Sequence, residues 1–168
     1  MEFPIVVLGS ASVGKTSLIS QYKWNNLPKY EDPTTEITFW LKNKQILSPK
    51  DKLKIWDTPG RRRFQHVVRN ILPESRGALV VYDIHDRDSY RDARDWVAEL
   101  KALKRSEKFI IVLVGNKSDI AEGREVSTTE AKEYAKRHEL IFKEASAVTK
   151  CNVEACFNAL IQASIDEN

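Results

Sequence analysis

Short apolar runs rich in β-branched residues alternate along the chain with longer stretches whose apolar residues recur about every 3.6 positions. The runs predict buried parallel strands, and the periodic stretches predict helices that bury one face. The predicted strands are residues 3–8, 53–56, 78–82, 109–114 and 140–142. The predicted helices are residues 15–24, 89–103, 128–138 and 152–165, and a hydroxyl of Ser127, Thr128 or Thr129 is expected to cap the third.

Residues 36–47 alternate apolar and polar side chains, which predicts an exposed second strand that is antiparallel to the third. The alternating order of strands and helices predicts an α/β fold. In it, a six-stranded, mostly parallel sheet with one antiparallel strand carries helices on both faces. Such sheets bind ligands beyond the carboxyl ends of their strands, so functional motifs are expected directly after strands.

Composition narrows the function classes. The 168 residues fit one domain, 1–168, and 42% hydrophobic with 30% charged residues is typical of a folded protein. Lys and Arg outnumber Asp and Glu by 27 to 24, a surplus too small and too dispersed to indicate nucleic-acid binding. No basic leader and no run of about 18 apolar residues occurs, so a soluble, cytoplasmic protein is expected.

The cysteines and histidines show no pattern of a disulfide framework or a metal site. Cys151 and Cys156 are expected to be small core residues. The histidines are expected to be surface or structural residues: His66, His85 and His138.

Residues 9–16 read GSASVGKT and stand between the first predicted strand and the first predicted helix. They fit the phosphate-binding pattern G-x-x-x-x-G-K-[ST] in the context that the pattern requires. The glycines let backbone N–H groups turn toward phosphate oxygens, and Lys15 would neutralise the β and γ phosphates. The hydroxyl of Thr16 is a hard oxygen suited to Mg²⁺, so the nucleotide implies a magnesium ion.

Two further motifs follow strands. Residues 57–60 read DTPG, which alone is typical of a turn. Beside a phosphate loop, Asp57 would hold the magnesium shell through water and Gly60 would donate its backbone N–H to a γ phosphate. Residues 116–119 read NKSD, which resembles the N-K-x-D pattern of guanine-nucleotide-binding domains. The resemblance implies that Asp119 accepts hydrogen bonds from the N1–H and exocyclic amine of guanine. Adenine lacks these two donors, so bound ATP would leave the Asp119 carboxylate unpaired. The site would therefore reject ATP.

With these motifs the chain resembles the Ras superfamily of small GTPases over residues 9–148, nearly its whole length. The resemblance implies a P-loop small G domain that binds GTP or GDP with Mg²⁺. It implies that Thr34, 19 residues after Lys15, coordinates magnesium in the GTP state and releases it after hydrolysis. The implied nucleotide-binding residues are Ser12, Val13, Gly14, Lys15, Thr16, Ser17, Thr34, Gly60, Asn116, Lys117, Asp119, Ser146, Ala147 and Val148.

The same resemblance implies the roles of single residues. Ala147 would offer its N–H to the guanine carbonyl. Leu27 stands where an aromatic residue commonly stacks on guanine, and Val148 stands in place of a lysine that lies along the base. The loss of that lysine predicts a somewhat looser hold on the nucleotide without a change in the choice of base. The implied metal ligands are Thr16, Thr34 and, through water, Asp57; the implied catalytic residues are Lys15, Thr34, Gly60 and Arg61.

Within the superfamily the chain is most similar to Rab proteins. Phe39 and Trp56 match two of three aromatics that many Rab proteins turn toward partners, although strand aromatics are common for other reasons. The third aromatic is absent. Residues 73–75 read PES where a tyrosine pair is usual, and the segment 64–76 is about three residues longer than usual. We therefore expect a reshaped switch II that regulators of ordinary Rab proteins need not recognise.

Arg61 occupies the position after DTPG where the family places the glutamine that orients the attacking water. Arginine has no hydrogen-bond acceptor, so intrinsic hydrolysis should slow by about tenfold or more. Ala11, where Ras-type chains have glycine, adds crowding at the phosphates. The opposing hypothesis is that Arg61 stabilises charge on the γ phosphate in cis, as an arginine finger does.

These observations predict a GTP hydrolase that acts as a slow molecular switch, monomeric, contacting effector and regulator proteins through its two switch regions, in vesicle trafficking or related signalling. The alternative is a non-hydrolysing module that stays loaded with one nucleotide, which Arg61, Leu27 and Val148 favour. A P-loop kinase is a third reading, but it has no use for NKSD. Membrane association, at the cytosolic face of endomembranes, would need a lipidated tail outside this sequence.

Overall fold

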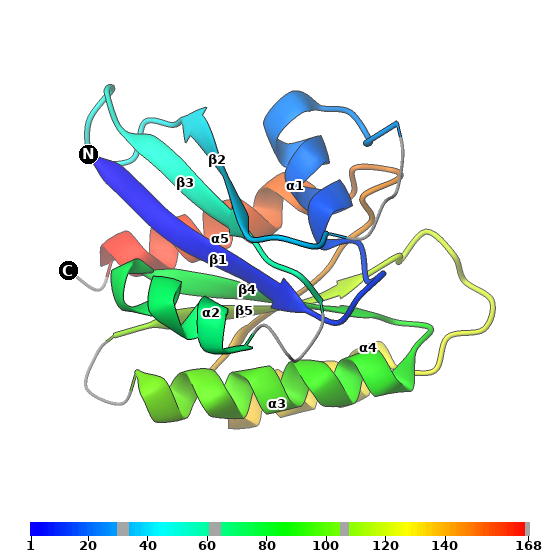
Figure 1. Ribbon diagram of the computed structural model, residues 1–168. Coiled ribbons are helices and arrows are strands. Elements are labelled where there is room, and N and C mark those ends of the chain that lie inside the picture. Colours follow the sequence, from blue (N-terminus) through cyan, green and yellow to red (C-terminus); the bar gives the residue numbers. More distant parts are fainter. Residues whose placement is uncertain (30–33, 61–64, 105–107, 167–168) are drawn as a thin grey trace.

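The computed structural model describes residues 1–29, 34–60, 65–104 and 108–166, apart from the side chains of residues 66 and 67. Within these residues a six-stranded sheet forms the centre of the molecule, in the order β2-β3-β1-β4-β5-β6 (Figure 1). β2 is antiparallel to β3, and every other neighbouring pair is parallel. The strands are β1 (Glu2–Gly9), β2 (Thr38–Asn43), β3 (Lys52–Asp57), β4 (Gly77–Asp83), β5 (Ile110–Asn116) and β6 (Ile141–Glu144).

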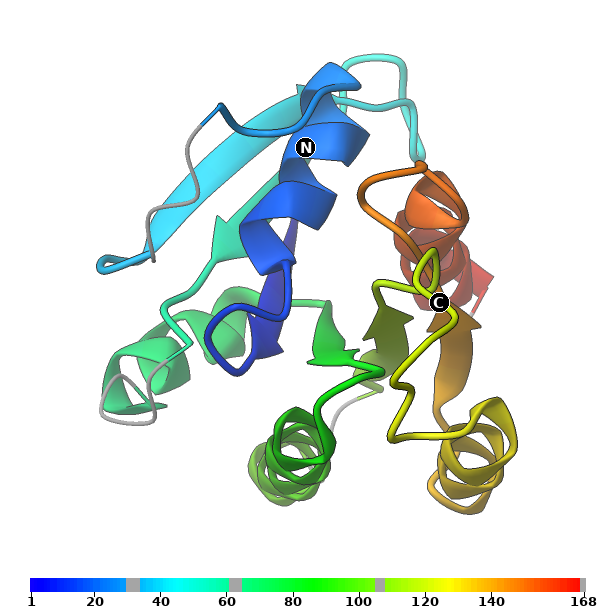
Figure 2. The same cartoon turned by 90° about the vertical axis from the view of Figure 1, so that its right-hand side faces the viewer.

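Helices cover both faces of the sheet (Figure 2). One layer holds α1 (Lys15–Trp24) and α5 (Val153–Asp166), whose Leu18 and Phe157 share an apolar core with Ile5 of β1. The other layer holds α2 (Gln65–Ile71), α3 (Arg87–Leu103) and α4 (Thr128–Arg137), which pack on the alternate residues of the same strands. The α/β fold with one antiparallel strand is confirmed.

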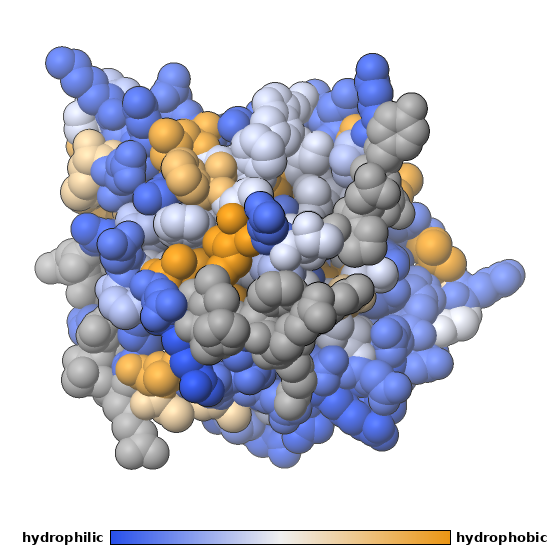
Figure 3. Space-filling model, viewed as in Figure 1, coloured by the Kyte–Doolittle hydropathy of each residue, from blue (hydrophilic) through white to orange (hydrophobic). Residues whose placement is uncertain are grey.

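The helices follow the periodicity of their sequences. In α3 the buried positions include Tyr90, Ala93, Trp96, Val97 and Leu100, while the outer face, seen in Figure 3, is hydrophilic. Asp86 caps its start by accepting from the backbone N–H groups of Asp88 and Ser89. For α4 the structure selects Ser127 as the cap, since its hydroxyl oxygen accepts from the Glu130 N–H at 3.1 Å.

Some predictions need correction. The strands extend one or two residues beyond most predicted ends, because ladder hydrogen bonds continue after the apolar run stops. α2 and the following 3-10 turn, Leu72–Glu74, were not predicted, since so short a segment shows little periodicity. Cys156 is buried as expected, but Cys151 is exposed, because it lies in the turn before α5. No helix among the described residues is long and apolar enough to cross a membrane.

Candidate nucleotide-binding site

A cavity of about 290 Å³ opens at the carboxyl edge of the sheet, where loops from distant parts of the chain converge. Leu27, Pro28 and Ile120 add apolar walls to it. Val13 and Ser146 are buried behind the wall. The other predicted nucleotide-binding residues line it: Ser12, Gly14, Lys15, Thr16, Ser17, Thr34, Gly60, Asn116, Lys117, Asp119, Ala147 and Val148.

The loop between β1 and α1 needs glycine at two positions. Gly9 has φ +149°, and a Cβ there would lie 2.3 Å from the carbonyl oxygen of Val81. Gly14 has φ +96°, and a Cβ there would lie 2.3 Å from the amide nitrogen of Asn116. Between them Ser12 also takes a left-handed conformation, with φ 64°. The loop therefore curls tightly before α1 begins at Lys15 and presents its helix N-terminus to the cavity.

The ammonium of Lys15 is buried at the floor of this loop, with 6% of the residue exposed. Its Nζ donates to the carbonyl oxygens of Gly9 at 2.8 Å and Ser10 at 2.7 Å. Burial lowers the pKa of Lys15 to about 8, and the nearby Asp57 carboxylate opposes part of that shift. A buried cation whose hydrogen-bond partners among the described residues are carbonyl oxygens is suited to an anion such as a phosphate.

The predicted magnesium residues meet beside Lys15. Thr16 Oγ1 donates to Asp57 Oδ2 at 2.8 Å and lies 2.9 Å from Thr34 Oγ1. Burial raises the pKa of Asp57, while the hydrogen bond from Thr16 and the charge of Lys15 act in the opposite direction. Asp57 Oδ1 is buried and has no hydrogen-bond partner among the described residues. Two hydroxyls and an unsatisfied carboxylate oxygen fit a magnesium ion and its water shell.

The loop after β5 carries the predicted base-reading residues 116–119, and we call it the base-reading loop. Hydrogen bonds connect it to the predicted phosphate loop, residues 9–16. Asn116 Nδ2 donates to the Val13 carbonyl at 2.8 Å, and Lys117 Nζ donates to the Ser12 carbonyl at 2.9 Å. Asp119 Oδ1 accepts from the Ser146 hydroxyl at 2.8 Å, which orients the carboxylate toward the cavity that it lines. The Ala147 N–H, predicted to meet the guanine carbonyl, lies 3.3 Å from Asn116 Oδ1, a long hydrogen bond.

Comparison with known protein families matches residues 4–166 to the Ras family. The chain belongs to the Ras family. Curated relatives are Rab proteins, and their similarity extends over almost the whole chain. Ras-related protein Rab-11B of Dictyostelium discoideum is 38% identical over 156 residues, 93% of this chain and 70% of the relative. Human Ras-related protein Rab-30 is 36% identical over 165 residues, 98% of this chain and 81% of the relative.

Mouse Ras-related protein Rab-17 is 38% identical over 158 residues, 94% of this chain and 73% of the relative. The chain is therefore a Rab-like small GTPase, a switch that binds guanine nucleotides. Its family hydrolyses GTP, uses Mg²⁺ with the nucleotide and engages effectors and regulators through the switch regions. The alternative of a non-hydrolysing module receives no support from these relatives.

The predicted partner-facing aromatics of this Rab-like GTPase form one pair on the antiparallel edge of the sheet. Phe39 of β2 and Trp56 of β3 stack edge to face with ring centroids 5.1 Å apart. Lys54 Nζ lies 4.7 Å from both centroids. Phe39 is 48% exposed, which leaves one ring face open to a partner.

Arg61, which the sequence predicts to be a catalytic residue, lies outside the described residues, as does residue 64, where the lengthened segment 64–76 begins. Other contacts were missed by sequence reasoning. Ser10 donates from its hydroxyl to Asp92 of α3 at 2.6 Å. Asp83 lies 3.0 Å from Lys117 Nζ through its Oδ2. The available signal was a carboxylate at the end of β4, on the sheet edge that carries the other motifs.

Proposed function

We propose that this Rab-like GTPase holds GTP or GDP with Mg²⁺ in the cavity at the carboxyl edge of its sheet. The observation that carries the proposal is the arrangement of one continuous cavity. Lys15 and Thr16 line its phosphate end, and Asp119 lines its base end. The residues 1–168 would form one G domain that acts as a monomer.

Base selection rests on Asp119. Its carboxylate accepts from Ser146 through one oxygen, which leaves acceptor capacity for the N1–H and amine of guanine. Adenine presents no such pair of donors, so its binding would leave the carboxylate unpaired. The long Ala147 N–H bond to Asn116 is weak enough to be shared with the guanine carbonyl. Leu27 and Val148 would pack on the base through apolar contact alone.

The other end of the cavity would bind the phosphates and the magnesium ion. Thr16 and Thr34 would ligate the magnesium ion directly and Asp57 through water. The ion supplies charge neutralisation between the terminal phosphates. Lys15 would place its ammonium on the β and γ phosphates in exchange for the two carbonyls that it contacts here. The backbone N–H of Gly60 would orient the γ phosphate, so Gly60 and Thr34 would respond to the loss of that group.

Arg61 sets the rate in this proposal. Its guanidinium has donors only and cannot accept a hydrogen bond from the attacking water, so intrinsic hydrolysis would be slow. The two nucleotide states would then persist long enough to select different partner proteins. The Phe39 and Trp56 pair would contact those partners, in vesicle trafficking or related signalling. Such a protein would work in the cytoplasm and at the cytosolic face of endomembranes.

The test begins with the purified chain, whose bound nucleotide is identified by chromatography. Release of labelled phosphate from preloaded GTP is then followed in a single turnover for the parent and for Arg61→Gln. Arg91→Gln makes the same change on α3, where Arg91 pairs with Asp88 on the surface, and serves as control. The expected result is slow cleavage by the parent and by Arg91→Gln, with about tenfold faster cleavage by Arg61→Gln.

Faster cleavage by the parent than by Arg61→Gln would contradict the slow-switch proposal and support Arg61 as a residue that stabilises the γ phosphate in cis. Bound adenine nucleotide, or no nucleotide at all, would contradict the assignment of the cavity itself.

A further inference from the structure

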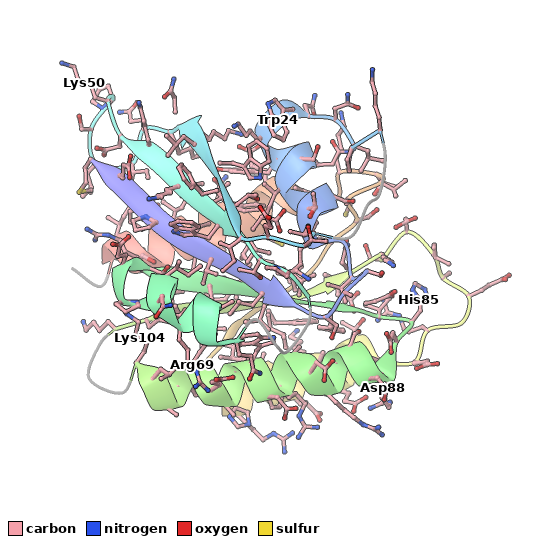
Figure 4. The ribbon with its side chains drawn as sticks, in the orientation of Figure 1. Trp24, Lys50, Arg69, His85, Asp88 and Lys104 are labelled. Carbon is pink, nitrogen blue, oxygen red and sulfur yellow. The ribbon has the colours of Figure 1, made fainter. Side chains whose placement is uncertain are left out.

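His85 lies between the end of β4 and the loop that follows β5 (Figure 4). Its Nδ1 is 2.9 Å from Asp83 Oδ1, and its Nε2 is 2.8 Å from the carbonyl oxygen of Ile120. The Asp83 oxygen also accepts from the His85 backbone N–H at 2.9 Å, so the ring is fixed on both sides. Its side chain is only 18% exposed.

Both partners of this ring are hydrogen-bond acceptors. A neutral imidazole donates from one nitrogen only, and its other nitrogen would then present a lone pair to an oxygen. An imidazolium donates from both nitrogens and makes both bonds at once. A neutral ring therefore keeps only one of the two contacts as a hydrogen bond, either that with Asp83 or that with Ile120.

Both partners of the His85 ring are connected to the nucleotide cavity. Ile120 follows Asp119 directly and lines the cavity wall. The other oxygen of Asp83 lies 3.0 Å from Lys117 Nζ, and the same Nζ donates to the Ser12 carbonyl in the phosphate loop at 2.9 Å. Through these two contacts His85 links the end of β4 to the loop that carries Lys117 and Asp119.

The other charged side chains on the packed segments have partners of their own. Asp86 caps α3, and Arg87 pairs with Glu130. In the loop before α4, Arg124 pairs with Glu144, and Glu125 accepts a hydrogen bond from the backbone N–H of Arg87 at 2.8 Å. Asp83, Lys117, Asp119 and Glu122 complete the charged set on these segments, and of these the carboxylate of Asp83 contacts the ring.

We propose that His85 is a positioning residue for guanine-nucleotide binding, and that its protonation anchors the loop after Asp119 and slows release of the nucleotide. The inference rests on the proposed function of the cavity. It adds a dependence on pH at a residue that lies outside the binding motifs. Loss of one of two hydrogen bonds should speed release about twofold to tenfold.

The experiment loads the whole chain with a fluorescent GDP analogue and Mg²⁺ and measures its release, chased by excess GDP, from about pH 5.5 to about 7.5. This window stays below the pKa of Lys15, which is about 8. In the parent, release should accelerate with pH through a single midpoint. In His85→Gln the release should be fast and should not change with pH. His138→Gln, altered on α4 where the ring packs on Tyr134, should behave as the parent does.

The outcomes separate this inference from the proposed function. A chain that retains no guanine nucleotide at any pH contradicts the proposed function. A chain that retains the nucleotide but releases it independently of pH overturns the role of His85 alone, as does a pH dependence that survives unchanged in His85→Gln.

Discussion

Asn116 donates from its Nδ2 to the backbone carbonyl of Val13 at 2.8 Å, so one buried amide joins the base-reading loop to the phosphate loop. The residue is 1% exposed, and its Oδ1 accepts from the Ala147 N–H. Its nitrogen also fills the space where a Cβ on Gly14 would stand. Three segments at the cavity, those of Val13 and Gly14, of Asn116 and of Ala147, therefore meet at one side chain.

Asn116→Ala should weaken both the fold and the site. It leaves the Val13 carbonyl and the Ala147 N–H without their partner in a buried position, which costs about 1–3 kcal/mol of unfolding free energy. If the GDP-bound state loses the same amount of stabilising free energy, GDP release should become about tenfold faster or more. Thermal unfolding in excess GDP and release of a fluorescent GDP analogue measure the two effects.

Asn158→Ala is the matched control, because Asn158 sits on α5 and accepts from Lys44 Nζ at 2.9 Å, away from the cavity. It should release GDP at the parent rate. If Asn116→Ala also released GDP at the parent rate, the link between the two loops would have no role in binding.

Much of the fold could be predicted because its central strands β1, β4 and β5 are mostly apolar runs buried on both faces. β4, for example, is almost wholly buried. A strand that helices cover on both faces must be apolar along nearly its whole length. α1 was predicted with its observed bounds, since the motif fixes its start at Lys15 and Asn25 ends it in a left-handed conformation. α2 was missed because its seven residues are too few to show a period.

The site was predictable where a motif concentrates it in a few consecutive residues. The contacts that depend on tertiary structure were not. Ser10 meets Asp92 from 82 positions away, and His85 meets Ile120 from 35 positions away. His85 was expected to be merely a surface or structural residue, since a lone histidine after a strand carries no spacing signal. Only the packing of the strand ends brings such partners together.

Removal of Mg²⁺ should accelerate GDP release, because in the proposed site Thr16 and Asp57 would hold the nucleotide partly through the ion. In Thr16→Val the hydroxyl that contacts Asp57 and Thr34 is lost. The Mg²⁺ concentration needed for half-maximal retention of GDP should then rise by about tenfold or more. Release is measured in a series of Mg²⁺ concentrations buffered by EDTA.

Ser20→Ala removes a hydroxyl from the next turn of the same helix, where Ser20 donates to the Asn26 carbonyl. Its Mg²⁺ requirement should match the parent. A Thr16→Val variant with the parent requirement would show that another group holds the ion.

GDP affinity should fall as pH rises above about 8. Burial lowers the pKa of Lys15 from 10.5 to about 8 in the free protein, whereas a bound phosphate favours its ammonium. Binding then takes up a proton at higher pH, so affinity declines by at most tenfold per pH unit and is level below about 8. For the free fold the sign is opposite, because the unfolded chain binds more protons here and stability rises with pH.

Fluorescence titrations with a GDP analogue between about pH 7 and about 9.5 measure this decline. Lys15→Arg keeps its charge throughout this range, so its weaker binding should stay level. A parent affinity that is level to about pH 9.5 would mean that Lys15 keeps its proton in the free protein.

Gly60→Ala should block the chemistry more than the binding. A Cβ at Gly60 would lie 2.2 Å from the Ala11 nitrogen and 2.4 Å from its Cα, so the segment after β3 must move away from the phosphate loop. Displacing the Gly60 N–H by about 1 Å should slow single-turnover GTP hydrolysis by about tenfold to a hundredfold. GDP release should change less, because Lys15, Asn116 and Asp119 stay in place.

Gly123→Ala is the control, since no atom of the described residues lies within 4 Å of an added Cβ there, although its φ of +73° adds local strain. It should hydrolyse GTP at the parent rate. Hydrolysis by Gly60→Ala at the parent rate would mean that the contact between Gly60 and Ala11 opens at no cost to the reaction, and that the N–H of Gly60 does not orient the γ phosphate.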